Sequence, residues 1–274
     1  MSRVRNCGFT LVELAVVLAI VGLLLGSLMY TLSAQVERRD FEETRRRLEQ
    51  AREMLLTYAM VNGRLPCPAR SAATVSPVTV PGDEVRDASG ACTGDAITDY
   101  YGGTNAGVTL GLLPARTIGW SHVDSSGLAI DAWNNRIRYA VANLITNCSS
   151  GATSPPPHFT NATNLRANGI SCQPNDLLIC KSATGITSTA CGGASNQLMT
   201  QSLLVAIVWS TGKNGASSTG GSGLDEAANL NGDRIYVWHV PSPSQAANGE
   251  FDDQMLWITA PELYGRLISA GMLP

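Results

Sequence analysis

Four side chains in the C-terminal part of the sequence have the chemistry of metal ligands. Asp225, Glu226, Asn231 and Asp233 stand close together in the chain, and carboxylate and carbonyl oxygens in a loop suit calcium. Their spacing, however, fits no defined calcium-binding pattern. A solvated acidic loop is therefore the favoured interpretation. Calcium at Asp225 and Asp233 is the alternative, and we expect no other cofactor.

Catalytic chemistry has little support in this sequence. The chain contains no Gly-x-Ser-x-Gly, His-Glu-x-x-His or phosphate-loop pattern. Its three histidines, His122, His158 and His239, have no zinc-ligand spacing, and no Cys-x-x-Cys pair accompanies them. We therefore expect that the protein is not an enzyme.

The N-terminal region carries one carboxylate beside a long apolar run. A leader with two arginines ends at Gly8, and the 23 residues from Leu14 to Val36 contain no charge. About 20 apolar residues in a helix cross the hydrocarbon core of a bilayer, and the positive flank predicts a cytoplasmic N-terminus. Glu13 lies at the edge of the run, where a carboxylate held near the bilayer centre costs about 2.5–3.5 kcal/mol. Glu13 is therefore a functional candidate.

The segment Gly8-Phe9-Thr10-Leu11-Val12-Glu13 resembles the prepilin signature of type IV pilins and type II secretion pseudopilins. The resemblance implies that a prepilin peptidase cuts after Gly8 and methylates the new amine of Phe9. It also implies that the apolar helix stays on the mature subunit. A secretory signal is disfavoured because the apolar run is too long and no Ala-x-Ala-type site follows it.

Cleavage gives Glu13 a specific role in this interpretation. The carboxylate of Glu13 can pair with the Phe9 amine of a neighbouring subunit when the helices stack. An unpaired charge buried among helices is expensive, so the pair removes that cost only in the correct register. We assign Glu13 to assembly, and a carboxylate that snorkels to the membrane interface is the alternative.

Two internal segments extend the resemblance. Residues 131–139 are similar to the Asp-x-Trp-Gly-x-Pro-x-x-Tyr segment of pseudopilins, although Asn135 departs from the glycine or proline types found there. Residues 210–215, Ser-Thr-Gly-Lys-Asn-Gly, resemble the turn before the last pseudopilin strand. Major pseudopilins hold a calcium ion near that last strand, where the acidic residues from Asp225 to Asp233 lie in this chain. Major pilins usually carry a proline in their helix where this chain has Tyr30 in an uninterrupted stretch, and the segments between the motifs are expanded. These departures favour a minor subunit.

The cysteines predict disulfides. Seven are present, and cleavage after Gly8 would remove Cys7 and leave six. An even number in an exported domain indicates a disulfide framework. Proximity along the chain favours the pairs Cys67–Cys92, Cys148–Cys172 and Cys180–Cys191.

The predicted helix continues beyond the apolar run. Six acids and six arginines lie between Glu37 and Glu53, several of them paired four residues apart. An apolar stripe on the same segment needs a sheet as its partner; its members are Phe41, Leu48, Ala51, Leu55, Tyr58 and Ala59. Asn62-Gly63 predicts the end of the helix, which would span about 80 Å from Phe9.

The remainder of the chain predicts a sheet-rich domain. It is rich in Gly, Ser, Thr, Asn and Pro and carries few charges between Ala140 and Leu224, which indicates short strands and long polar loops and not helices. We expect strands near Ile137–Leu144, Leu177–Cys180, Leu203–Trp209 and Arg234–Val240, and a final helix near Pro261–Ala270. Loops are expected at Ser149–Pro157 and Gly212–Gly223.

The expected fold class is α+β. It comprises a leader peptide at residues 1–8, a hydrophobic helix at 9–62 that spans the membrane to about residue 36, and a globular domain at 63–274. The pilin resemblance implies an antiparallel sheet in that domain, with long disulfide-bonded loops.

The expected function is assembly. The resemblance implies a minor pilin or pseudopilin that enters a type IV pilus or a type II secretion pseudopilus through its N-terminal helix. An adhesin or cargo-binding head on the same helix is the alternative. Expected partners are other pilin-type subunits, the prepilin peptidase and an inner-membrane assembly platform.

The expected location is the bacterial inner membrane. The chain would cross it once, with its C-terminal domain in the periplasm, before it enters the pilus or pseudopilus. Nucleic acid is not an expected partner, because residues 63–274 carry eleven basic and fifteen acidic side chains. Binding to DNA depends mainly on neutralised phosphates.

Overall fold

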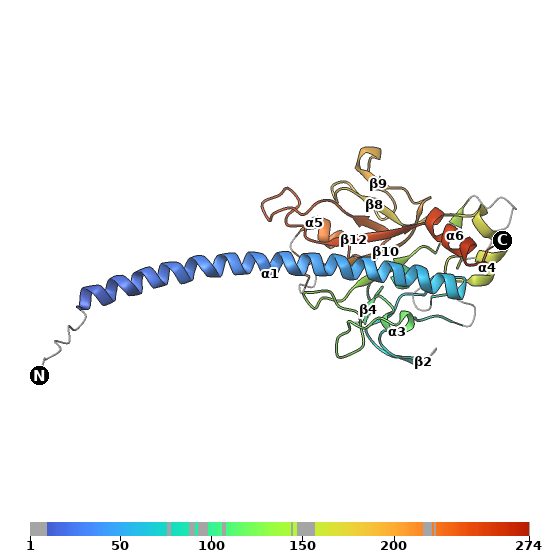
Figure 1. Ribbon diagram of the computed structural model, residues 1–274. Coiled ribbons are helices and arrows are strands. Elements are labelled where there is room, and N and C mark those ends of the chain that lie inside the picture. Colours follow the sequence, from blue (N-terminus) through green and yellow to red (C-terminus); the bar gives the residue numbers. More distant parts are fainter. Residues whose placement is uncertain are drawn as a thin grey trace, which may run out of the picture. The chain divides into compact units, whose positions relative to one another are not determined.

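Figure 1 shows a computed structural model of the chain, which describes residues 10–75, 78–87, 91–92, 98–105, 108–143, 145–146, 157–215, 221 and 223–273. The chain divides into two compact units, residues 1–42 and 43–274. Helix α1 (Leu11–Asn62) begins in the first unit and ends in the second. Gly63 ends the helix with a φ of 69°, and its N–H donates to Ala59 O at 2.8 Å. A left-handed glycine is a common helix C-terminus, so the stop expected at Asn62-Gly63 is present.

The second unit contains short helices and strands. In chain order they are β1 (Thr74–Val75), β2 (Val78–Thr79), α2 (Thr98–Tyr101), β3 (Gly103–Asn105), β4 (Val108–Leu110), α3 (Ala115–Ile118), β5 (Arg138–Val141), β6 (Ile145–Thr146), α4 (Ala162–Asn168), β7 (Gln173–Pro174), β8 (Leu178–Cys180), β9 (Gln197–Met199), β10 (Leu204–Ser210), α5 (Leu224–Ala228), β11 (Ile235–Val237), β12 (Gln254–Thr259) and α6 (Ala260–Ser269).

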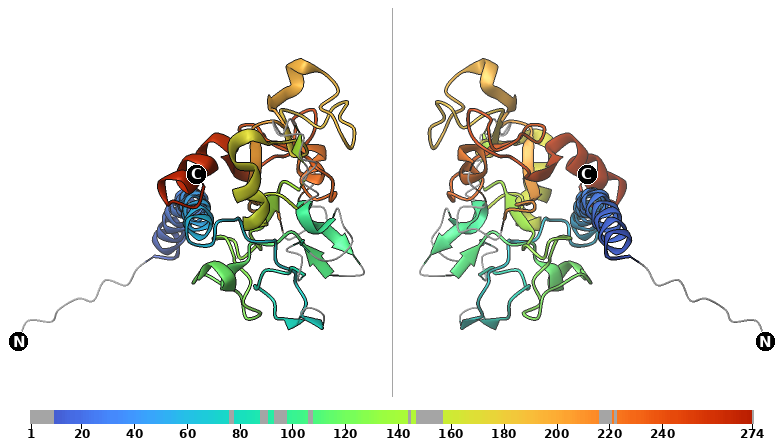
Figure 2. Two further views of the ribbon diagram at one scale, coloured as in Figure 1. Left: turned by 90° about the vertical axis from the view of Figure 1, so that its right-hand side faces the viewer. Right: turned by 90° about the vertical axis from the view of Figure 1, so that its left-hand side faces the viewer.

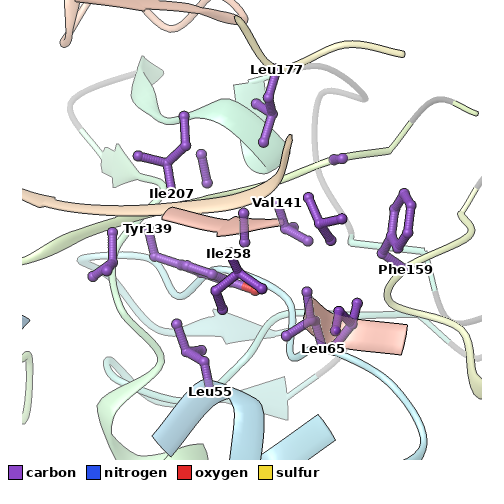
Figure 3. Close-up of a cluster of buried hydrophobic side chains, with 14 of the residues drawn as sticks. Leu55, Leu65, Tyr139, Val141, Phe159, Leu177, Ile207 and Ile258 are labelled. Atoms are coloured by element: carbon purple, nitrogen blue, oxygen red, sulfur yellow. The ribbon is translucent and has the colours of Figure 1, made fainter. Parts of the chain in front are cut away.

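The central sheet has the order β12-β10-β5, and both strand pairs are antiparallel. All seven residues of β10 are buried, which requires cover on both faces of the sheet. The apolar stripe of α1 covers one face, where Leu55 points toward Ile258 of β12 (Figure 3). Leu48, Ala51 and Ala59 are buried in the same core. The apolar stripe therefore packs on a sheet, as predicted.

A second sheet, of order β11-β8-β9, covers the other face. The rings of Trp209 (β10) and Tyr236 (β11) meet edge to face at 5.1 Å, and those of Trp238 and Trp257 meet at 5.8 Å. The central sheet is antiparallel, as expected, whereas β11 pairs with β8 in parallel and departs from that expectation. Parallel neighbours need a long crossover connection, and here β9, β10 and α5 lie between the two strands in sequence.

The strand predictions hold for the strongly apolar segments. Strands β5, β8 and β11 lie inside predicted strands, and β10 is shifted by one residue at each end. Strand β12 was not predicted. Helix α4 was also missed, because the segment around it has few charges and many small polar residues. Asn161 caps α4 by accepting hydrogen bonds from Thr163 N and Asn164 N, and Leu165 buries its apolar side.

Helix α6 joins the end of α1 to the sheet. Figure 2 shows the two helices next to each other in both turned views, and two ion pairs connect them. Arg52 pairs with Glu262 at 2.5 Å, and Arg266 pairs with Glu53 at 3.1 Å. Leu263 of α6 is buried in the same core as the α1 stripe. The last turns of α1 are therefore an integral part of the globular unit.

Two of the three predicted disulfides are present among the described residues, Cys67–Cys92 and Cys180–Cys191. Cys172 is also disulfide-bonded, and its predicted partner Cys148 lies outside the described residues. The Cys180–Cys191 bond closes a loop that begins at the end of β8. A closed loop has less conformational entropy to lose on folding, which stabilises the native state.

His158 makes the stability of the fold depend on pH. Its side chain is fully buried beside the Phe159 ring, and within the described residues neither ring nitrogen has a hydrogen-bond partner. Burial lowers the pKa of His158 from 6.5 to about 4. The unfolded chain therefore binds the proton more readily, so stability is complete above pH 6.5 and falls as the pH drops toward 4.

We expect the free energy of unfolding to fall by about 2 kcal/mol from this residue alone between pH 7.5 and pH 5. The measurement is denaturant unfolding of the wild type and of a His158→Phe variant at both pH values. The contribution of His158 is the part of the pH dependence that the variant lacks. An equal pH dependence in both proteins would contradict the assignment.

Candidate functional site

The two internal segments that resemble pseudopilin motifs lie against each other. The buried carboxylate of Asp131 accepts a hydrogen bond from Ser210 Oγ at 2.5 Å. Its other oxygen accepts from the N–H groups of Trp133 and Asn135, and Asn135 Nδ2 donates to Gly212 O at 2.6 Å. Burial raises the pKa of Asp131 even though these hydrogen bonds favour its ionised form. The contacts fix residues 210–215 at the end of β10.

The same loop is attached to α1. Arg47 Nη1 donates to the carbonyl oxygens of Ile130 and Asp131 at 3.1 and 2.7 Å, and Ala132 N donates to Thr44 Oγ1 at 3.1 Å. Thr44 is fully buried, although its position gives no apolar signal. Polar contacts thus add to the apolar stripe where α1 meets the domain.

An acidic cluster lies beyond the end of β10. One side-chain oxygen from each of Glu226, Asp252 and Asp253 lies within 4.8 Å of the others, a geometry that can hold a metal ion. The predicted ligands Asp225 and Asp233 are not members of this cluster. Asp225 instead pairs with His239 and accepts from Ala183 N. The assignment of Asp225 and Asp233 as calcium ligands therefore stays a prediction, and the acidic cluster is made of other residues.

The remaining residue predicted there is also engaged elsewhere. Asn231 Nδ2 donates to Asp233 at 2.9 Å, and the other carboxylate oxygen of Asp233 accepts from Ile235 N at 2.7 Å. These local contacts form the turn before β11. Among the contacts described, neither Asn231 nor Asp233 reaches the acidic cluster.

Neighbouring donors orient the cluster but do not neutralise it. Glu226 Oε1 accepts from Asn214 Nδ2 at 2.9 Å and from Asp252 N at 3.1 Å. Asp252 Oδ2 accepts from Lys213 N at 3.0 Å, and Asp253 Oδ2 accepts from Asn229 Nδ2 at 2.7 Å. All these donors are uncharged amides or backbone N–H groups. Burial and the charge of Glu226 raise the pKa of Asp252 to about 7, and burial raises that of Asp253 well above its usual range.

Three oxygens at the cluster have no hydrogen-bond partner in the described part of the chain: Asn214 Oδ1, Asp252 Oδ1 and Asp253 Oδ1. Asp253 is only 3% exposed, so its orphaned oxygen has no access to bulk water. Leaving a buried acceptor unsatisfied costs about 1–3 kcal/mol. Hard oxygen ligands of this kind are those that calcium prefers, so the residues present fit the ion that the pseudopilin resemblance implies.

Two glycines leave room for the cluster. A Cβ on Gly212 would overlap the Asp252 carboxylate, and a Cβ on Gly221 would overlap the carboxylate of Glu226. Both glycines also have positive φ, at 63° and 148°. The signal of this cluster in the sequence is the adjacent pair Asp252-Asp253, immediately before an apolar strand.

At the other end of the chain, Glu13 lies in the exposed first turn of α1. Its Oε2 accepts from both the N–H and the hydroxyl of Thr10 at 2.9 Å, and Glu13 N is 3.3 Å from Thr10 Oγ1. This reciprocal arrangement is a capping box, which satisfies backbone donors at a helix start. The Thr-x-x-Glu spacing is the signal of this cap in the sequence.

The N-terminal segment matches a known sequence family. Residues 3–29 match the family model of the prokaryotic N-terminal methylation motif. This match supports the resemblance of the N-terminal segment to type IV pilins and pseudopilins. No curated protein and no solved structure matches the chain at a significant level.

The motif has general consequences for a pilin-type chain. Proteins with this signature are processed by a prepilin peptidase and assemble with other pilin-type subunits. In this chain Gly8 and Phe9, the predicted cleavage and methylation residues, lie outside the described residues. Within the part of the chain that the structure describes, no helix combines the length and hydropathy needed to cross a bilayer.

Proposed function

We propose that the protein is a minor pilin or pseudopilin subunit that works by assembly and not by catalysis. The observation that carries the proposal is the methylation motif at residues 3–29, which overlaps the start of the continuous helix α1. The peptidase cuts after Gly8, the amine of Phe9 is methylated, and the helix enters a type IV pilus or a type II secretion pseudopilus. Glu13 sets the register against a neighbouring subunit.

The membrane topology belongs to the same proposal. The uncharged segment from Leu14 to Val36 supports a single pass through the bacterial inner membrane, and the arginines of the leader support a cytoplasmic N-terminus. The disulfides Cys67–Cys92 and Cys180–Cys191 support a periplasmic location of the globular unit, because disulfides persist in oxidising compartments.

Two features support a minor subunit. Residues 216–250, which we call the insert, separate the turn at residues 210–215 from the last strand β12. Ile235 and Val237 of the insert form a small apolar core with β8, and Phe251, which directly follows the insert, belongs to the same core. Such an extra lobe would crowd the surface of a filament shaft if every subunit carried it. An adhesin or cargo-binding head is the second candidate, and the same lobe is the observation that favours it.

The proposal predicts a mature N-terminus at N-methyl-Phe9. Mass spectrometry of the protein extracted from membranes should show the loss of residues 1–8 and the gain of one methyl group. A Gly8→Val variant should stay unprocessed, because a branched side chain obstructs cleavage beside it, whereas an Asn6→Ala variant should be cut normally. Retention of Met1 in the wild type, or a cut after Ala34, would refute the assignment.

A further inference from the structure

We propose that Asn231 is a site of spontaneous deamidation, and that the carboxylate formed there loosens the turn before β11. Deamidation begins when the next backbone nitrogen attacks the side-chain amide, and a following glycine obstructs that attack least because it has no Cβ. The sequence has five such Asn-Gly pairs, which begin at Asn62, Asn168, Asn214, Asn231 and Asn248. The structure distinguishes one of them from the other four.

Three of the pairs are held by backbone hydrogen bonds. The N–H groups of Gly63, Gly169 and Gly249 each donate to a backbone carbonyl oxygen a few residues earlier in the chain. A nitrogen in such a bond cannot turn toward the preceding amide without breaking the bond, which costs free energy. We therefore expect these three asparagines to stay intact while the protein is folded.

The pair at Asn214 is held by its surroundings. Asn214 Nδ2 donates to the buried carboxylate of Glu226 at 2.9 Å, and Asn214 N donates to Asp252 Oδ2 at 3.4 Å. The backbone of Gly215 is crowded, since a Cβ there would overlap the side chain of Thr211. An attack by the nitrogen of Gly215 would have to displace these groups, so this pair is protected as well.

Asn231 is exposed, and its amide is set up for attack. Among the described residues, the N–H of Gly232 donates to no acceptor. Asn231 Oδ1 accepts from Asp233 N at 2.9 Å. A backbone N–H aimed at an oxygen that gains negative charge during the attack stabilises the transition state, as in an oxyanion hole. The other restraint, from Asn231 Nδ2 to Asp233 Oδ2 at 2.9 Å, lies on the exposed surface, where water can replace it.

The reaction needs only water as a co-reactant. The nitrogen of Gly232 gives up its proton and bonds to Asn231 Cγ, the Cγ–Nδ2 bond breaks, and ammonia leaves with that proton. The cyclic imide then takes up one water molecule. Opening at Cγ gives aspartate, whereas opening at the main-chain carbonyl gives isoaspartate, in which the chain runs through the side chain. Both products place a new carboxylate next to Asp233.

The test incubates the full-length protein in detergent at mildly alkaline pH, which favours loss of the proton from the attacking nitrogen. Peptide mass spectrometry over time should show a gain of one mass unit at Asn231 several-fold faster than at the other four pairs. The same incubation in denaturant should bring the five rates close together, because no pair is then held by the fold. A rate at Asn231 that does not exceed the other four in the folded protein would overturn the site. Differences that persist unchanged in denaturant would overturn its selection by the structure.

The effect on the turn is tested with Asn231→Asp, which carries the product carboxylate from the start. This variant loses the amide donor to Asp233 and gains a like charge beside it, and like charges in contact repel. The control is Ser244→Asp, which adds the same charge at an exposed position of the insert. Asn231→Asp should unfold at a lower temperature than the control, and protease should cleave its insert faster. Equal midpoints and equal cleavage rates would overturn the proposed loosening.

Discussion

A Glu13→Gln variant should be cleaved and folded normally but should fail to enter filaments. On the proposed function, the Glu13 carboxylate pairs with the methylated Phe9 amine of a neighbouring subunit. Breaking a buried ion pair by removing one partner costs about 3–5 kcal/mol, because the other charge stays buried and uncompensated. The expected result is a loss of the subunit from sheared filament fractions by at least about 100-fold, measured by immunoblot, with unchanged abundance in the membrane.

The choice of glutamine matters because Glu13 also caps α1. Glutamine can replace glutamate in a capping box, so Glu13→Gln removes the charge and keeps the cap. The matched control is Thr10→Ala, which keeps the charge and removes the cap at Thr10. That change should cost about 0.5–2 kcal/mol of helix stability and still allow assembly. Normal assembly of Glu13→Gln, or equal failure of both variants, would show that the carboxylate does not set the register.

A Glu84→Ala variant should lose about 3–5 kcal/mol of folding stability. The Glu84 carboxylate accepts hydrogen bonds from both Nη atoms of Arg64, at 2.6 and 2.8 Å, and also from Tyr58 OH and Cys67 N. Burial alone would raise the pKa of Glu84, but the hydrogen bonds and charge of Arg64 outweigh it and hold the pKa below its usual value. The pair joins the end of α1 to the disulfide-bonded start of the domain.

Denaturant unfolding of the protein in detergent measures this loss. Asp83→Ala is the control, because the neighbouring Asp83 pairs with Arg116 at 3.5 Å on the exposed surface and should contribute only about 0–1 kcal/mol. An Arg64→Met, Glu84→Leu double variant should recover part of the loss, since apolar replacement of both partners leaves no buried charge. If Glu84→Ala were no less stable than Asp83→Ala, the Arg64–Glu84 pair would not be important for folding.

Local pattern was enough to predict the elements whose residues are neighbours in sequence. The processing signature is a short contiguous motif, and the amphipathic stripe lies on the single helix α1, where spacing alone decides which side chains share a face. The apolar strand β10 was evident for the same reason, since a strand covered on both faces is apolar throughout. The disulfide Cys180–Cys191 could be proposed because its cysteines are close in the chain.

Contacts between distant segments decided the rest. The cluster of Glu226, Asp252 and Asp253 exists only because the insert returns to the start of β12, and nothing in the spacing of Asp225 and Asp233 revealed that they bond elsewhere. The parallel pairing of β8 and β11 depends in the same way on the path of the chain between them. Sequence therefore determined the processing signal and the helix through local periodicity. Tertiary structure alone decided which buried carboxylates meet, because their cost and their partners depend on neighbours that are remote in the chain.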